Sequence, residues 1–210
     1  MKALLAVVAT VVLTACVHHP QTQSRNPSFF APGAEPIPSK ALLERFYQVT
    51  RSVDSTTRDT VVEIVVQANF RSTRVQCTNL DGPPTRLSLS LARHAPATGA
   101  STVLLGVEYE ASEGLLASGA RSLQLQLNQA SLEPMQMPEP AHREAFTRSE
   151  KMLYAVSSHE LSRIVAADTA WMRLTGRAGQ CESPITGHAR GLIALFMERE
   201  LGEVVVAEIR

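Results

Sequence analysis

Residues 86–93 read RLSLSLAR, and leucine alternates with serine through the middle of this stretch. Successive side chains of a β-strand point to opposite faces, so the three leucines would share one face and the two serines the other. Such alternation is typical of an antiparallel sheet that buries one face and exposes the other to water. This stretch therefore predicts a strand in a sheet of that kind.

The same period of two recurs on both sides of this strand. The further strands that it predicts are 62–70, 72–78, 102–110 and 121–128. We expect 72–78 to pair with 62–70. The segments 94–101 and 111–120 are rich in Ala, Gly and Ser, which favours hairpin loops between consecutive strands.

Helical spacing precedes and follows this block. Residues 39–50 are predicted to form a helix, because Ser39 can cap it and Leu42, Phe46 and Val49 fall on one face. Near the C-terminus two short strands are predicted, at 151–156 and 171–175, and a helix follows each.

Local signals mark the ends of the two C-terminal helices. Ser157 and Glu160 have the spacing of a capping box at the start of the first. The dipeptide Ser183-Pro184 offers a cap and a proline for the first turn of the second, and Gly202 would end it. Because the strands come as a block, the predicted class is α+β: an antiparallel meander sheet packed by an N-terminal helix and two C-terminal helices.

The first sixteen residues, MKALLAVVATVVLTAC, differ from the rest of the chain. Lys2 precedes an apolar run, Ala3 to Leu13, that has the length of a signal-peptide core and is too short for an ordinary membrane-spanning helix. The run ends in Leu13-Thr14-Ala15-Cys16, a branched apolar residue and two small residues before a cysteine.

This tetrad resembles the lipobox of bacterial lipoproteins. The resemblance implies that the Cys16 thiol receives a diacylglyceryl group, that the chain is cut between Ala15 and Cys16, and that the new amine then receives a fatty acid such as palmitate. Residue 17 is Val rather than Asp, which resembles the signal for the outer membrane. An inner-membrane or cell-surface location, an ordinary secretory signal with a chance cysteine, and an uncleaved apolar helix are the alternatives.

The sequence divides into three parts on this basis. Residues 1–15 are the predicted signal peptide, 16–38 the lipidated cysteine and a tether, and 39–210 a single α+β domain. Five prolines within residues 17–38 favour an extended tether over a packed element. Lys and Arg together number 20, as do Asp and Glu, and no basic stripe occurs, so a nucleic-acid partner is not expected.

Two cysteines remain besides Cys16. Export would place Cys77 and Cys181 where disulfides persist, and they are the one pair available if Cys16 is lipidated. Closing a loop of about 100 residues stabilises a fold by roughly 4.7 kcal/mol in the chain-entropy model. The alternative is two separate buried thiols.

Catalytic and metal-binding patterns are weak. Gly-x-Ser-x-Gly, His-Glu-x-x-His and Cys-x-x-Cys are absent from the sequence, so no catalytic residue, metal site or cofactor is predicted. Cys181 and His188 could suggest a catalytic pair, but a disulfide partner and a surface histidine are the simpler interpretation. Glu108 and Glu110 share one strand face, and a solvated carboxylate pair is the simpler interpretation of these two. His18 and His19 lie together in the tether beside Cys16, and the other histidines, which are scattered over separate elements, are His94, His142, His159 and His188.

A set of uncharged polar residues could form a binding face for a protein or a glycan, although a solvated outer face is the simpler interpretation. Its members are Gln67, Asn69, Ser88, Ser90, Gln124, Gln126 and Asn128. Trp171, the single tryptophan, is expected near the edge of the core.

The function predicted from these features is that of a non-catalytic lipoprotein on the periplasmic side of the outer membrane. Its role would be structural, or it would bind an envelope protein. One alternative is a binding protein for a small apolar ligand, held between the sheet and the last helix in a cavity lined by Leu123, Leu125, Phe196 and Met197. A second is a hydrolase in which His188 or His159 meets a serine and an acidic residue.

Overall fold

The computed structural model describes residues 35–69, 74–80, 84–112, 114–115, 117, 122–137 and 149–203. Cys16, the predicted signal cleavage site and most of the predicted tether lie outside these residues. So do His18, His19 and His142. The described residues belong to one compact unit.

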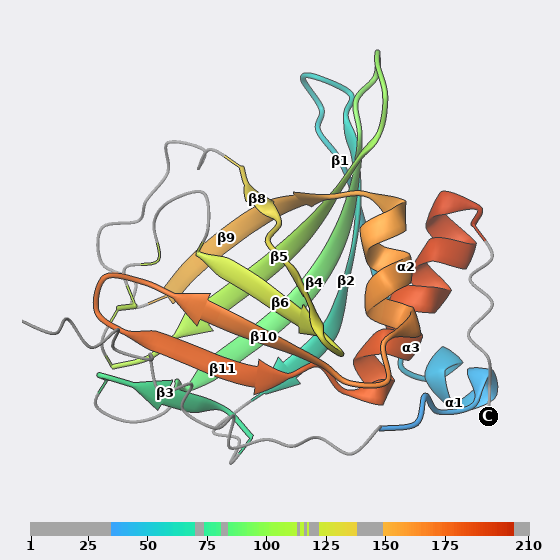
Figure 1. Ribbon diagram of the computed structural model, residues 1–210. Coiled ribbons are helices and arrows are strands. Elements are labelled where there is room, and N and C mark those ends of the chain that lie inside the picture. The colour runs from blue at the N-terminus through green and yellow to red at the C-terminus, as the bar shows by residue number, and fades with distance from the viewer. Residues whose placement is uncertain are drawn as a thin grey trace, which may run out of the picture. The chain divides into compact units, whose positions relative to one another are not determined.

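The larger of two antiparallel sheets contains the alternating stretch 86–93 (Figure 1). Its order is β1 (Val49–Val53), β2 (Thr60–Asn69), β4 (Arg86–Ala95), β5 (Thr102–Glu110), β9 (Ser149–Val156) and β8 (Met135–Gln136). Strands β2, β4 and β5 form an antiparallel meander, of which the β4–β5 hairpin is the predicted part, and Leu89 stands opposite Val107 in its register.

A second sheet departs from the predicted single meander. Its order is β3 (Gln76–Thr78), β11 (Gln180–Pro184), β10 (Ala170–Thr175), β6 (Leu123–Leu127) and β7 (Ala130–Leu132). The expected hairpin at 111–120 is wrong, because β5 and β6 belong to different sheets. The expected pairing of 72–78 with the preceding strand is also wrong, because β3 pairs with β11.

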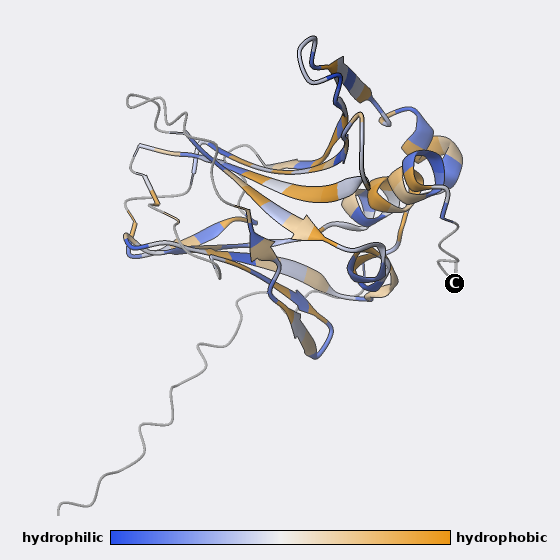
Figure 2. Ribbon diagram, turned by 90° about the horizontal axis from the view of Figure 1, so that it is seen from above, coloured by the Kyte–Doolittle hydropathy of each residue, from blue (hydrophilic) through white to orange (hydrophobic). Residues whose placement is uncertain are grey.

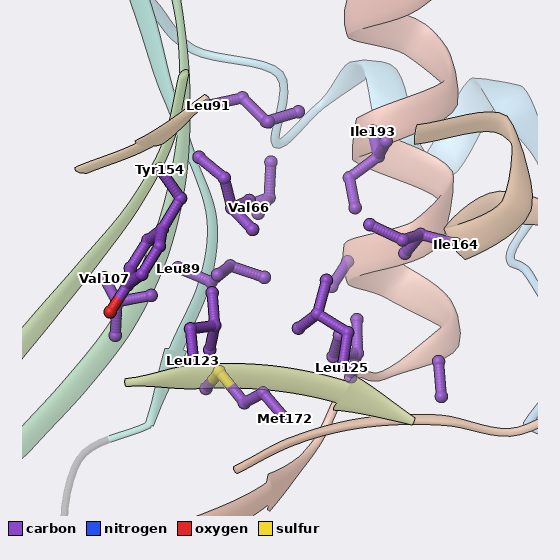
Figure 3. Packing of buried hydrophobic residues seen from close by; sticks show 14 of the residues in the cluster. Val66, Leu89, Leu91, Val107, Leu123, Leu125, Tyr154, Ile164, Met172 and Ile193 are labelled. Atoms are coloured by element: carbon purple, nitrogen blue, oxygen red, sulfur yellow. The ribbon is translucent and has the colours of Figure 1, made fainter. Parts of the chain in front are cut away.

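The two sheets lie as layers with the helices at one end (Figure 2). Leu89 and Val107 of the large sheet point toward Leu123 and Met172 of the small one (Figure 3). All four are at most 1% exposed. A second layer over the alternating strands therefore removes their apolar face from water, which is the main stabilising term of such a fold.

The C-terminal helices follow the predicted order, and one of their two predicted starts is confirmed. Helix α2 (Ser158–Ala166) has the predicted capping box: the Glu160 amide donates to Ser157 Oγ, and the Ser157 amide donates to a Glu160 carboxylate oxygen. Helix α3 (Gly187–Phe196) continues into a π-helical turn, η1 (Met197–Leu201). Gly202 ends it, as predicted, and adopts the left-handed conformation at φ 72° that is common after helices.

The predicted start of the last helix is wrong. Ser183 and Pro184 belong to β11, which the sequence analysis did not predict, and the helix cap is Thr186, whose Oγ1 accepts from the Ala189 amide at 3.1 Å. Ser183 stands opposite Met172 in the register of the small sheet and is fully buried. Pairing with β10 thus overrides the local capping signal.

The predicted helix at 39–50 is reduced to one short turn, α1 (Lys40–Glu44). Its buried residue is Leu43, whereas Leu42 and Phe46, which were expected to face the core, are exposed. Val49 is not helical, because it begins β1 and stands opposite Ile64 of β2. Among the described residues, no helix is long and apolar enough to cross a membrane.

Candidate functional site

The best-defined polar site in the described structure lies where the N-terminal segment joins the domain. Arg190, on α3, is 5% exposed. Its guanidinium donates one hydrogen bond to the Ala167 carbonyl, at the end of α2, and another to the Glu35 carbonyl. One buried side chain thereby links both C-terminal helices to the chain that enters the domain.

Burial lowers the pKa of the Arg190 guanidinium from its ordinary value, and Glu35 and Asp168 oppose this shift. Arginine nevertheless keeps its charge in proteins, so Arg190 holds a cation in a nearly water-free position. Two carbonyl oxygens compensate in part for the lost hydration, since hydrogen bonds from charged donors are stronger than neutral ones.

Two glycines allow the entering chain to approach α3 closely. A Cβ at Gly187 would overlap the carbonyl group of Pro36. A Cβ at Gly191 would lie 2.5 Å from a methyl carbon of Leu43. Residues 35–43 therefore pack against α3 at a distance that larger side chains would not permit.

Three ion pairs continue this contact along the C-terminal turn. Lys40 pairs with Glu198 at 2.7 Å, and Arg51 pairs with Glu200 at 2.8 Å. Arg199 pairs with Glu44 at 2.6 Å. Ion pairs with exposed partners contribute at most about 1 kcal/mol each to the free energy of unfolding. Their main effect is therefore to fix the orientation of residues 40–51 on η1.

Glu200 is the least exposed carboxylate of the three pairs. Tyr47 donates to it at 3.4 Å, and its backbone carbonyl accepts from Arg93 of β4 at 2.7 Å. Burial, with a smaller effect of Glu200, raises the pKa of Tyr47 to about 12. η1 is thus connected to α1, β1 and the large sheet together.

Buried polar side chains also connect the two sheets. The Gln67 amide on β2 donates to the Pro184 carbonyl at 2.8 Å and accepts from the Thr186 amide at 2.9 Å, which fixes the start of α3. Tyr154 on β9 meets Ser122, just before β6, at 2.7 Å between hydroxyl oxygens, and burial raises its pKa to about 12. Gln67 faces inward because the register of β2 shifts between Val65 and Gln67.

The predicted polar face is therefore not one surface. Gln124 and Gln126 lie on the small sheet and Asn128 in the turn after it, whereas Ser88 and Ser90 lie on the large sheet. The two serines are only 4% and 8% exposed, so they do not form an open polar surface. The side chain of Asn69 lies outside the description.

The outer side of the large sheet curves over these serines. Lys151 of β9 and Glu63 of β2 form an ion pair at 3.4 Å, although β4 and β5 separate their strands. In the register Lys151 stands level with Ser88, whereas Glu63 stands opposite Ala92, four positions further along β4. In a flat sheet the two residues would be about 14 Å apart across the strands and similarly far apart along them, which exceeds the reach of their side chains, so the sheet is curved there.

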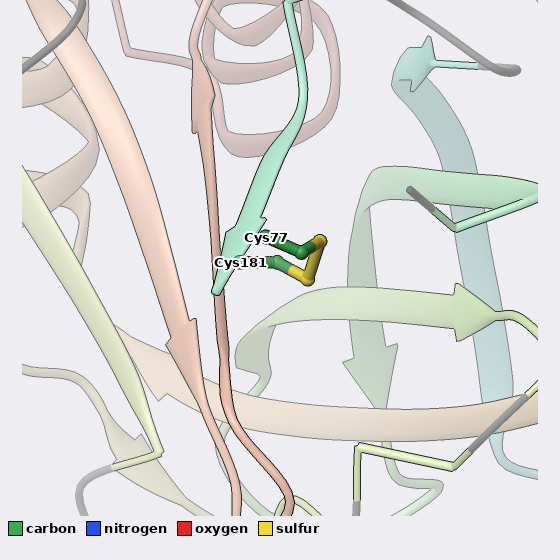
Figure 4. The surroundings of a disulfide bond; sticks show 2 residues. All are labelled: Cys77 and Cys181. Atoms are coloured by element: carbon green, nitrogen blue, oxygen red, sulfur yellow. A yellow bond between two sulfur atoms is a disulfide. The ribbon is translucent and has the colours of Figure 1, made fainter. Parts of the chain in front are cut away.

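The predicted disulfide is present in the structure. Cys77 of β3 and Cys181 of β11 stand opposite each other in the register, with sulfur atoms 2.03 Å apart. The bond lies on the side of these strands that faces the larger sheet (Figure 4). It joins residues 104 positions apart and attaches β3, which has three residues, to the small sheet.

The histidines that are described do not assemble a catalytic group. His188 packs edge-on against the Phe46 ring, with centroids 5.1 Å apart, and His159 is exposed on α2. His94 lies 3.3 Å from an Asp59 carboxylate oxygen. No three His, Cys, Asp or Glu side chains of the described residues come together as metal ligands would.

The paired glutamates have ordinary surroundings. Glu108 lies 3.3 Å from the guanidinium of Arg86 and accepts from Ser88, and Glu110 is exposed. Trp171 is partly buried on the small sheet, with the guanidinium of Arg173 5.4 Å from its ring centre.

The residues expected to line a ligand cavity belong to the packed core. Leu123, Leu125, Phe196 and Met197 are each fully buried within one hydrophobic cluster. Hollows of about 450 and 460 Å³ open elsewhere at the surface of the described unit, the first beside Arg93 and the second beside Arg163.

Compared with protein-family models, curated proteins and solved structures, the chain gives no significant match. The leader sequence and the contacts of residues 35–43 are therefore the features that bear on function.

Proposed function

We propose that this chain is a lipoprotein anchored through lipid on Cys16, with its domain on the periplasmic side of the outer membrane and with a structural or protein-binding role. The observation behind the proposal is the leader, in which an apolar run of signal-peptide length ends in Leu13-Thr14-Ala15-Cys16. Lipidation with two or three acyl chains would make dissociation from a bilayer slow, because each buried methylene contributes about 0.8 kcal/mol.

The way the domain holds residues 35–43 agrees with this role. A domain attached by its N-terminus receives any pull from the membrane at the point where the chain enters it. Here that point is joined to α2 and α3 through Arg190 and is packed closely against Gly187 and Gly191. The disulfide is of the kind that persists in exported proteins.

Lipidation is tested by Cys16→Ala in the full-length chain, expressed with a fatty-acid probe. We expect the variant to lose the label and to leave the membrane fraction, because the acceptor thiol is gone. The matched control is the double variant Cys77→Ser/Cys181→Ser, which should keep the label at Cys16. Full labelling of Cys16→Ala would refute the anchor.

The interaction role is tested by crosslinking the native lipoprotein in its envelope and identifying the adducts by mass spectrometry. We expect adducts with one or a few envelope proteins, reduced by substitutions on a defined surface. Adducts that merely reflect protein abundance would contradict a specific partner.

A further inference from the structure

Two large apolar side chains project from the segment that follows the entry point of the chain. Leu42 of α1 is 42% exposed, and Phe46, about one helical turn further on, is 56% exposed. Their neighbour Leu43 is buried against Gly191, which fixes the orientation of the turn on α3. The edge-on contact of Phe46 with His188 leaves over half of Phe46 free. We call Leu42 and Phe46 the α1 patch.

The charges around the α1 patch do not oppose approach to a bilayer. Lys40 and Glu44 are each neutralised by an ion pair with η1, to Glu198 and Arg199. Arg45, exposed between the two patch residues, adds a positive charge that anionic lipid headgroups attract.

We propose that the α1 patch rests on the lipid surface to which Cys16 attaches the protein, so that the α1 side of the domain faces the membrane. This inference rests on the proposed lipid anchor. The patch follows Glu35 by only a few residues, and Glu35 is held by Arg190. The chain between Cys16 and that point is residues 17–34. Even extended at about 3.1 Å per residue, a Pro-rich chain of that length spans only roughly 55 Å, which keeps the domain close to the bilayer, and it enters the domain on the α1 side.

Patch size favours lipid over a protein partner. A stable protein interface buries about 800 Å² on each side and involves some 20 residues, which far exceeds two side chains. Shallow insertion of a few apolar groups at the headgroup boundary is, by contrast, a common mode of membrane contact. Attachment through Cys16 also raises the effective concentration of the patch at the bilayer, so weak intrinsic affinity is sufficient.

The test uses the full-length lipidated protein in vesicles of phosphatidylethanolamine and phosphatidylglycerol. Leu42→Cys and Phe46→Cys are labelled in separate samples with an environment-sensitive dye, the native cysteines being occupied by lipid and by the disulfide. Met135→Cys is the matched control, because Met135 is 69% exposed on β8, at the opposite edge of the large sheet from β1. Quenching is measured with spin-labelled lipid and with aqueous iodide.

We expect the dyes at positions 42 and 46 to be quenched several-fold more by the spin-labelled lipid than the dye at 135, and less by iodide. Equal quenching at all three positions, in protein that carries lipid and sediments with vesicles, would overturn the α1 contact and leave the anchor intact. If neither quencher reached the dyes at positions 42 and 46, lipid would not be what covers the α1 patch. A protein, such as a second copy of this chain, would then be indicated. Absence of lipid on Cys16 would refute both proposals.

Discussion

At the scale of single residues, Arg190 of α3 links the end of α2 to the chain that enters the domain. It is a nearly buried cation that bridges two backbone carbonyls from different parts of the chain. An arginine in the middle of a helix is usually an exposed residue, so neither its burial nor its partners could be predicted from the sequence.

We expect Arg190→Met to lower the free energy of unfolding by about 1–3 kcal/mol, because it leaves the carbonyls of Glu35 and Ala167 without their charged donor. Limited proteolysis should also cut residues 35–43 faster. Arg190→Lys should not restore either property, since one ammonium group does not reproduce the fork of a guanidinium.

The control for Arg190 is Arg177→Met, at an exposed position, which should change the free energy of unfolding by less than about 0.5 kcal/mol. Denaturant unfolding and proteolysis of purified protein measure both effects. An Arg190→Met protein as stable and as resistant as the parent would disprove the bridging role.

At the scale of elements, the sequence correctly predicted the strands and the helix start that have a clear local residue pattern. The alternation in 86–93 and 102–110 correctly predicted β4 and β5, and the Ser157–Glu160 spacing correctly predicted the start of α2. The prediction for residues 180–184 is wrong, because Ser183-Pro184 suggests a helix cap, while pairing with β10 makes these residues a strand. The helix predicted at 39–50 is wrong in extent, because Val49 begins β1 and pairs within the large sheet.

The packing of residues 35–43 on α3 predicts different effects for two glycines. Gly187→Ala should destabilise the protein by about 1–3 kcal/mol, because the added methyl meets the backbone of Pro36, which cannot move without displacing the segment. Gly191→Ala should cost less, because the Leu43 side chain can rotate and alanine favours the helix by about 1 kcal/mol.

Denaturant unfolding of the two glycine variants provides the measurement, and each serves as the matched control for the other. If Gly187→Ala proved the more stable of the two, close packing of Pro36 against α3 would be wrong.

At the scale of the whole molecule, the disulfide connects distant parts of the chain. The segment between Cys77 and Cys181 contains strands of both sheets and helix α2. We expect Cys77→Ala/Cys181→Ala to lower the free energy of unfolding by about 2–5 kcal/mol, because the unfolded chain regains its freedom.

Strand β3 should lose hydrogen-exchange protection in that double variant before the rest of the small sheet, since it has three residues and pairs with β11 alone among the described strands. Chemical denaturation and hydrogen exchange measure the two effects. An unfolding free energy unchanged within about 0.5 kcal/mol would show that the bond does not stabilise the fold.

Residue spacing and count are enough to identify the segments that alternate, the start of α2 and the two cysteines that could pair. The anchor proposed at Cys16 also depends on the sequence alone. Tertiary structure alone decided that the strands form two sheets, that Arg190 is buried, and that Leu43 rather than Leu42 faces the core. The physical reason is that a period of two specifies a buried face without specifying its partner, and burial depends on what packs there from elsewhere in the chain.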